Sequence, residues 1–224
     1  MPKISACSES NSVGFHHSEN QDSLLVDEVN LVVAVADGVG GYSGAKEASS
    51  YAVDFLGKNA AKLRDASSLA QLIKEIHTGI QEKAAKLGFL NMGTTIAVAK
   101  VLPGQLALVG NVGDSPILLF RKNEIIQAYE DDSQRLKDPM SMYGIIQYLG
   151  LDCDLKVHAE TIQCDRGDAL LLCSDGVTDN LLNSDGGKAK LSALAKSGDV
   201  PGIVKAALEQ GIKPDDMTAV LISF

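Results

Sequence analysis

The stretch LVVAVADGVGGYSG, residues 31–44, constrains the fold of this chain more than any other segment. Its run of apolar residues, rich in valine, predicts a buried β-strand over residues 31–36. The strand ends abruptly on Asp37, and a glycine-rich corner follows directly. Asp-Gly is a common turn pair, so one such aspartate has a simple structural explanation. A functional explanation requires the pattern to recur.

Short apolar runs bounded by Gly, Pro or Asp predict strands along much of the chain. They cover residues 3–8, 22–26, 31–36, 94–101, 105–113, 116–120, 124–129, 155–162, 168–174 and 217–224. Residues 44–63 and 68–87 predict two long helices, and residues 188–197 and 200–211 predict two shorter ones. In the second long helix one face carries apolar side chains, namely Leu69, Leu72, Ile73, Ile76, Ile80 and Leu87.

The order of these elements favours an α+β fold. Two helices follow one another and several strands then come in succession, unlike the regular alternation of a parallel sheet. Tight connections at residues 102–105 and 121–124 predict hairpins and antiparallel sheets covered by helices. No repeat or low-complexity linker interrupts the sequence, so we expect one domain over residues 1–224.

Composition limits the partners and the compartment. The net charge of −9 and the pI near 4.9 argue against nucleic acids and anionic membranes as partners. The four cysteines form no C-x-x-C pair and predict buried, reduced thiols. The chain begins without an export-like segment, and its longest apolar run is far shorter than the roughly 20 residues that span a bilayer. We therefore expect a cytoplasmic protein.

The opening pattern recurs at other strand ends. Asp37, Asp114 and Asp175 follow apolar runs, whereas Asp22 and Asp215 lead into them. Carboxylates that meet at one sheet edge repel one another unless cations hold them. Hard oxygen ligands select Mg²⁺ or Mn²⁺, and zinc-type spacing of His and Cys is absent from the sequence.

The glycines of the corner fit the same hypothesis. Gly38, Gly40 and Gly41 allow a sharp turn and a close approach to a ligand, and the Gly38 carbonyl can itself bind a metal. The phosphate-loop pattern G-x-x-x-x-G-K-[ST] is missing, which excludes that type of nucleotide site.

The ordered segments ENQDS, VADGVGGYSGAKEAS, GTTIAVA, VGNVGDSPILL, LLLCSDGVTD and PDDMTAVLI resemble the successive motifs of a known family. It is the metal-dependent, type 2C protein serine/threonine phosphatases, and the resemblance is to compact, bacterial-type members. It runs from about Glu19 to Ile222. It implies a four-layer αββα sandwich with two central antiparallel sheets. It also implies two Mn²⁺ or Mg²⁺ ions at one end of the sandwich.

The resemblance carries over to individual residues. Asp37 matches the aspartate that bridges both ions, and the Gly38 carbonyl matches a ligand of the second ion. Asp175 and Asp215 match the remaining carboxylate ligands of the first ion. In this family a hydroxide between the two ions attacks phosphorus in line, so no side-chain nucleophile is needed. The sequence agrees, because no cysteine has an arginine six residues later.

Other matches are less direct. Asp22 matches an acid that orients metal-bound waters. Asp114 and Asp179 match residues that can hold a third, weaker ion. Many members carry a phosphate-binding arginine five residues before the first-motif aspartate, where this chain has His17. His17 is either a substitute phosphate donor, most effective when protonated, or an exposed loop histidine.

We therefore expect a protein phosphatase that acts on phosphoserine and phosphothreonine in signalling. Its partners would be phosphorylated proteins and an opposing serine/threonine kinase, and we expect a monomer. Two alternatives stay open: a weakly active or inactive regulatory or binding module on the same fold, which the missing arginine keeps open, and a hydrolase of small phosphomonoesters.

Overall fold

A computed structural model describes residues 2–10, 19–39, 43–89, 91–122, 124–129, 131–135 and 143–224. His17, Gly40 and Gly41 lie outside these described residues. The elements are β1 (Lys3–Ser10), β2 (Ser23–Asp27), β3 (Val32–Ala36), α1 (Ala45–Asn59), the 3₁₀ helix η1 (Ala60–Lys62), α2 (Ala66–Leu87), β4 (Ile96–Leu102), β5 (Leu106–Val112), β6 (Ile117–Arg121), β7 (Glu124–Gln127), β8 (Ser133–Arg135), β9 (Tyr143–Ile145), β10 (His158–Gln163), β11 (Ala169–Cys173), α3 (Asp175–Leu182), α4 (Gly187–Ser197), α5 (Val200–Gln210) and β12 (Asp216–Ser223).

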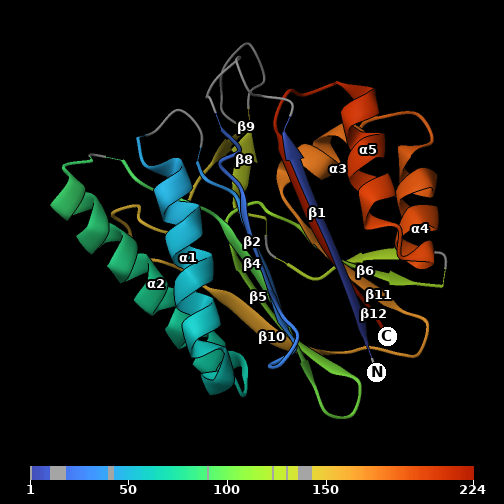
Figure 1. Ribbon diagram of the computed structural model, residues 1–224, viewed down its shortest axis with the longest axis horizontal. Coiled ribbons are helices and arrows are strands. Elements are labelled where there is room, and N and C mark those ends of the chain that lie inside the picture. Colours follow the sequence, from blue (N-terminus) through green and yellow to red (C-terminus); the bar gives the residue numbers. More distant parts are fainter. Residues whose placement is uncertain are drawn as a thin grey trace.

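Within the described residues, the strands form two five-stranded sheets and one two-stranded sheet. The first large sheet has the order β1-β12-β11-β6-β7, and the second has the order β10-β5-β4-β3-β2 (Figure 1). Neighbouring strands pair antiparallel in both. The small sheet pairs β8 with β9. The prediction of an α+β fold with antiparallel sheets is confirmed.

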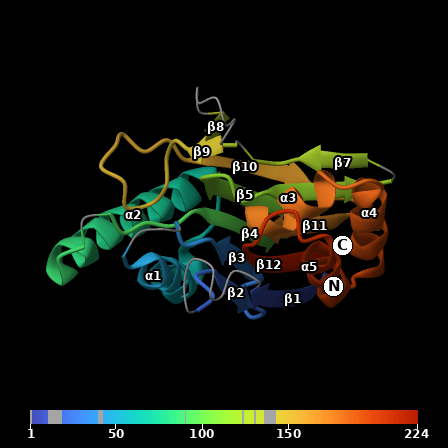
Figure 2. The same cartoon turned by 90° about the horizontal axis from the view of Figure 1, so that it is seen from above.

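Three apolar clusters of described residues show four layers. One joins α1 and α2 to the second sheet, and another joins α3, α4 and α5 to the first sheet. The third lies between the two sheets and contains Val33, Val109, Leu170 and Val220. Figure 2 shows this order, with helices outside and sheets inside. The αββα sandwich implied by the resemblance is confirmed.

The packing of strand β3 explains why residues 31–36 are uniformly apolar. Val33 and Val35 face the other sheet, whereas Val32, Ala34 and Ala36 face the helices. All five residues of the strand are fully buried. Because both faces are covered, the strand shows no polar alternation.

Helix α2 follows the predicted pattern except at its end. Asp65 caps its N-terminus by accepting a hydrogen bond from the Ser68 N–H at 2.8 Å. Five of the six predicted apolar positions are buried, but Leu87 is 50% exposed. The helix ends there because Gly88 follows with φ = 72°. The sequence pattern also does not predict α3, because its Asp-Gly start is typical of a turn.

The predicted burial of the cysteine thiols is confirmed for two of the four cysteines. All four cysteines lie in the described residues and are free. Cys173 is buried at the end of β11 and Cys164 is buried directly after β10, whereas Cys153 is exposed and Cys7 is half-buried. In the part of the chain that the structure describes, no helix is long and apolar enough to cross a membrane.

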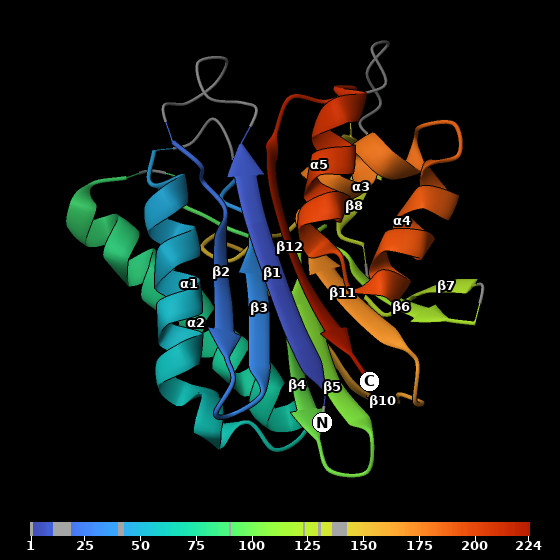
Figure 3. The ribbon, with the colours of Figure 1, turned by 45° about the vertical axis from the view of Figure 1, so that its right-hand side comes forward.

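The strand ends that carry the candidate aspartates lie at one end of the sandwich, opposite the two chain termini (Figure 3). At this end Gly38 and Leu149 each form an isolated antiparallel bridge with Thr94. The Val39 N–H also donates to the Gly93 carbonyl at 3.0 Å. This short ladder fixes the backbone that follows Asp37.

His77 of α2 holds the loop behind this ladder. Its side chain is buried, and Nδ1 accepts a hydrogen bond from the Gly150 N–H at 3.2 Å. Burial lowers the pKa of His77, and the negative charge of Asp152 partly opposes this shift. A nitrogen that accepts a hydrogen bond carries no proton, so the folded state favours the neutral imidazole.

We expect acid to destabilise the fold through His77. Because the folded pKa lies below the unfolded value of about 6.5, the unfolded chain binds the proton first as the pH falls. The free energy of unfolding should therefore drop between pH 7.5 and pH 5 by more in wild type than in His77→Gln, which keeps an acceptor but does not titrate. Urea unfolding of both proteins in EDTA measures this difference. A wild-type minus variant difference that is equal at both pH values would contradict the assignment.

Candidate metal centre

Five aspartates at strand ends come together between the two sheets. Asp22 and Asp37 flank β2 and β3, and Asp114 follows β5, so these three belong to the second sheet. Asp175 follows β11 and Asp215 precedes β12, so these two belong to the first sheet. The site therefore lies at the end of the seam between the sheets.

The pKa values show how closely these carboxylates interact. Burial raises the pKa of Asp37 well above its usual value, and the negative charges of Asp22, Asp175, Asp215 and Asp114 raise it further. Burial and the charge of Asp175 also raise the pKa of Asp114, to about 7. Each carboxylate thus makes its neighbours harder to ionise, which is the condition that a bound cation would relieve.

Hydrogen bonds fix the backbone of Asp37 between neighbouring strands. Its N–H donates to Thr95 Oγ1 at 3.0 Å, and its carbonyl accepts from the Thr95 N–H at 2.8 Å. The Thr95 and Ser115 hydroxyls are 2.6 Å apart. Because Ser115 follows Asp114, this contact links the ends of β3 and β5 and sets the spacing of two candidate ligands.

Gly38 is required by close packing. A Cβ atom at this position would lie 2.7 Å from the Ala45 carbonyl oxygen and 2.8 Å from the Gln21 carbonyl oxygen. Both contacts are with backbone atoms, which cannot move aside easily. Any larger residue would shift the corner that places the Gly38 carbonyl beside Asp37.

Asp22 has a buried carboxylate that is only half satisfied. The residue is 3% exposed, and its Oδ2 accepts a hydrogen bond from Ser174 Oγ at 2.8 Å. Its Oδ1 is buried and accepts none from the described residues. Burial raises the pKa of Asp22 to about 7, the Thr218 and Ser174 hydroxyls oppose this, and the charge of Asp216 adds to it. A buried oxygen without a donor indicates a missing polar partner.

The loop before Asp22 is held by an acid from the other sheet. Asp216 is 3% exposed, and its Oδ2 accepts a hydrogen bond from the Gln21 N–H at 2.7 Å. The Asp22 N–H in turn donates to Asn20 Oδ1 at 2.8 Å. These contacts place Asp22 relative to the neighbouring Asp215.

Lys213 enters the cluster, although the sequence pattern did not predict it. Its Nζ lies 2.5 Å from Asp175 Oδ2, 3.0 Å from Asp215 Oδ2 and 3.1 Å from Asp179 Oδ2. Burial disfavours the ammonium, but the charges of Asp175 and Asp215 outweigh it and raise the pKa of Lys213. A lysine two residues before a candidate ligand was the available signal, although spacing alone does not show where a long side chain points.

The donor set fits a hard divalent cation. The groups that converge are carboxylates, which suit Mg²⁺ or Mn²⁺, and Asp22 Oδ1 lacks a partner. Among the described residues, no three His, Cys, Asp or Glu side chains are positioned to hold an ion together. Three of the carboxylates instead converge on Lys213.

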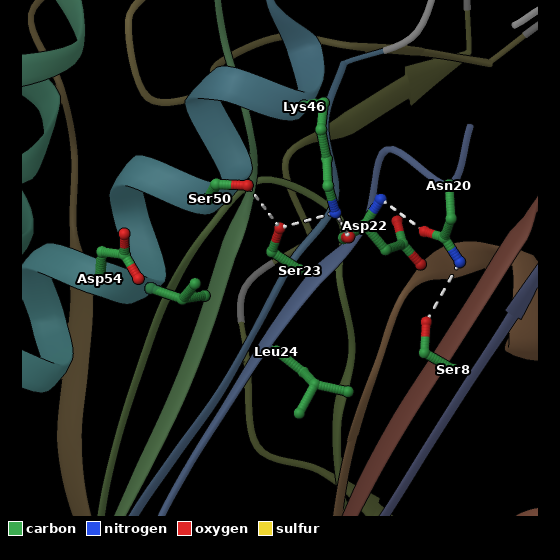
Figure 4. Close-up of a pocket in the computed structure, with 9 residues that line it drawn as sticks. Ser8, Asn20, Asp22, Ser23, Leu24, Lys46, Ser50 and Asp54 are labelled. Carbon is green, nitrogen blue, oxygen red and sulfur yellow. Dashed lines mark hydrogen bonds between the residues drawn. The ribbon is translucent and has the colours of Figure 1, made fainter. Parts of the chain in front are cut away.

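A pocket of about 400 Å³ lies beside Asp22 at the edge of the sandwich (Figure 4). Residues of β1, β2, α1 and the loop before β2 line it, among them Ser8, Ser50 and the loop residue Asn20. The Lys46 Nζ donates to the Asp22 carbonyl at 2.6 Å and to Ser23 Oγ at 3.2 Å. This pocket adjoins the backbone of Asp22, whereas the Asp22 carboxylate points toward Ser174.

Comparisons with known proteins find similar sequences and similar structures. The family model described as protein phosphatase 2C matches residues 16–212. The chain is 30% identical over 186 residues to the serine/threonine phosphatase stp of Listeria welshimeri, covering 73% of each protein. It is 27% identical to the protein phosphatase PhpP of Streptococcus pneumoniae, covering 94% of each.

A solved structure is similar over nearly the whole chain. The phosphatase MsPP of Mycobacterium smegmatis, in complex with cacodylate, has 26% identity and a TM-score of 0.82, covering 99% of this chain and 98% of that one. The catalytic domain of PstP, solved with two manganese ions, has a TM-score of 0.81 at 23% identity, covering 99% of this chain and 97% of that one, and shows the fold.

We expect Asp37→Asn to remove most of the stabilisation that Mn²⁺ gives to the fold. A ligand at 100 times its Kd stabilises a protein by about 2.7 kcal/mol, and the variant should lose much of this gain. Thermal unfolding with and without Mn²⁺ measures it. Asp27→Asn is the matched control, because Asp27 lies at the other end of β2 and accepts hydrogen bonds from its own turn. An equal Mn²⁺ shift in Asp37→Asn and wild type would contradict the metal site.

Proposed function

Because the chain belongs to the protein phosphatase 2C family, we propose that it hydrolyses phosphoserine and phosphothreonine in proteins with the help of divalent metal ions. One observation carries this proposal: the strand-end aspartates Asp22, Asp37, Asp114, Asp175 and Asp215 converge at the end of the seam between the sheets. The names of the relatives, which are serine/threonine phosphatases, support the substrate class.

The metal site in this proposal uses the residues of the corner and of the first sheet. Asp37 would be a ligand shared by two ions, either Mn²⁺ or Mg²⁺. The Gly38 carbonyl would hold one of them, and Asp175 and Asp215 would hold the other. When bound, such ions acidify a water molecule and neutralise the charge on the phosphoryl oxygens. The two manganese ions in the PstP structure support this count.

Three further aspartates of the cluster have proposed roles beside the two ions. Asp22 is buried, and its free Oδ1 points to a role as acceptor for the attacking water, whose proton it can hold. Asp114 and Asp179 are proposed ligands of a third, weaker ion. A thiolate mechanism lacks support, because burial and the charge of Asp175 raise the pKa of the neighbouring Cys173 thiol.

The same proposal implies the substrates and the opposing enzyme. The substrates are phosphorylated proteins, and an opposing serine/threonine kinase would restore the phosphate. A single catalytic domain over residues 1–224, a monomeric state and a cytoplasmic location remain predictions from the sequence. No observation favours the inactive module or the small-ester hydrolase over the phosphatase.

We expect robust Mn²⁺- or Mg²⁺-dependent release of phosphate from phosphoserine and phosphothreonine peptides, and its loss in EDTA. Asp37→Asn should abolish most of this turnover, since it removes a charged ligand while preserving volume. Phosphate release from the peptides and from a small aryl phosphate measures both effects. Turnover in a verified metal-free sample would refute the mechanism. Hydrolysis of the aryl phosphate alone would point to the small-ester alternative.

His17 is a separate proposal within this function, as a substitute for the phosphate-binding arginine. His17→Arg should then lower KM for a phosphopeptide, because a guanidinium stays charged and binds phosphate through two hydrogen bonds. A charged hydrogen bond of roughly 1.5–3 kcal/mol corresponds to about tenfold or more in kcat/KM. His17→Ala should weaken catalysis most at acidic pH. If the ratio of His17→Ala to wild-type activity is flat across pH and near one, His17 is only a loop residue.

A further inference from the structure

The metal centre contains a cation of its own. The Lys213 ammonium has three N–H donors and lies within hydrogen-bond distance of three carboxylate oxygens, those of Asp175, Asp179 and Asp215. We propose that Lys213 holds the metal-free site together and competes with the divalent ions, so that an ion must displace its ammonium from Asp175 and Asp215. This inference rests on the metal site of the proposed function.

The position of Lys213 is set by its backbone. The Lys213 N–H donates to Asn180 Oδ1 at 2.9 Å, and Asn180 Nδ2 donates to the Lys213 carbonyl at 2.9 Å. Asn180 is fully buried on α3, where its Nδ2 also donates to the Gly176 carbonyl at 2.7 Å. The same helix carries Asp175 and Asp179, so the lysine is tied to the element that presents two of its three partners.

The competition follows from shared carboxylates and from charge. Asp175 Oδ2 and Asp215 Oδ2 face the ammonium, and both belong to carboxylates that the proposed ion needs. A dication and an ammonium on the same two carboxylates repel each other strongly in a partly buried site. The two carboxylates cannot bind the ammonium and the dication with full affinity at the same time. Binding of one cation therefore lowers the affinity for the other.

The exposure of the three carboxylates indicates the direction in which the displaced ammonium can move. The Asp179 side chain is 44% exposed, whereas those of Asp175 and Asp215 are 23% and 28% exposed. Lys213 can therefore move toward solvent, on its flexible stem, while its backbone stays bound to Asn180. In the metal-free protein, Lys213 reduces the repulsion between the carboxylates. The site therefore binds metal only when the ion concentration is high enough to displace the ammonium.

Lys213→Gln tests this inference, because it removes the charge and leaves the backbone contacts with Asn180. We expect the Kd for Mn²⁺, measured by isothermal titration calorimetry on metal-free protein, to tighten about tenfold, within the usual range for coupled ligands. The melting temperature of the metal-free variant should fall below that of wild type. Lys205→Gln removes the same formal charge from an exposed position on α5 and should change neither quantity.

A measurement on the wild-type protein gives an independent answer, even if Lys213→Gln fails to fold. An amine-acylating reagent with mass spectrometry compares the labelling of Lys213 with that of Lys205, with and without Mn²⁺. We expect Mn²⁺ to increase the relative labelling of Lys213, since its ammonium leaves the carboxylates. Relative labelling that is unchanged or lower with Mn²⁺ would overturn the inference.

The outcomes separate this inference from the proposed function. A Mn²⁺ affinity that is equal or weaker in Lys213→Gln overturns the role of Lys213 and leaves the phosphatase proposal standing. Mn²⁺ binding that tightens in Lys213→Gln, in a protein that hydrolyses no phosphopeptide, supports the role of Lys213 and refutes the proposed activity.

Discussion

The repulsion between buried carboxylates at the end of the seam is the constraint on which the site depends. Strands β3 and β11 are buried along their whole length and carry no charged side chain, so their aspartates stand at the strand ends. Aspartates from both sheets meet there, and burial together with mutual charge raises the pKa of Asp37 and Asp114. Such a group stays fully ionised only with positive charge beside it. Lys213 supplies part of this charge, and the proposed metal ions would supply the rest.

Precise placement of these acids depends on contacts that cross between strands. The Thr95 and Ser115 hydroxyls join the corner at Asp37 to the turn at Asp114. Asp216 joins the first sheet to the loop before Asp22. These groups need not contact a metal to matter, since a ligand set works only when its members keep a fixed spacing. Buried polar residues beside the ligands thus serve the framework of the site.

Much of the fold and part of the site could be predicted from the sequence. Apolar runs located the strands of the described residues except β8 and β9, and helical periodicity located α1, α2, α4 and α5. The order of the motifs implied the four-layer arrangement. The errors were local: Leu87 is exposed because α2 ends beside it, and α3 begins at an Asp-Gly pair that is typical of a turn. Exposed Cys153 shows that composition does not decide the burial of one thiol.

By itself the sequence determined which acids stand at strand ends, because local periodicity and turn chemistry depend on neighbouring residues. Only the tertiary structure decided what each acid contacts. Asp22 bonds to Ser174, which is 152 positions away, and its second oxygen is left without a donor. Lys213 reaches Asp175 because the buried amide of Asn180 ties its loop to α3. The physical reason is that side-chain pairing depends on the packing of distant segments, which no local pattern records.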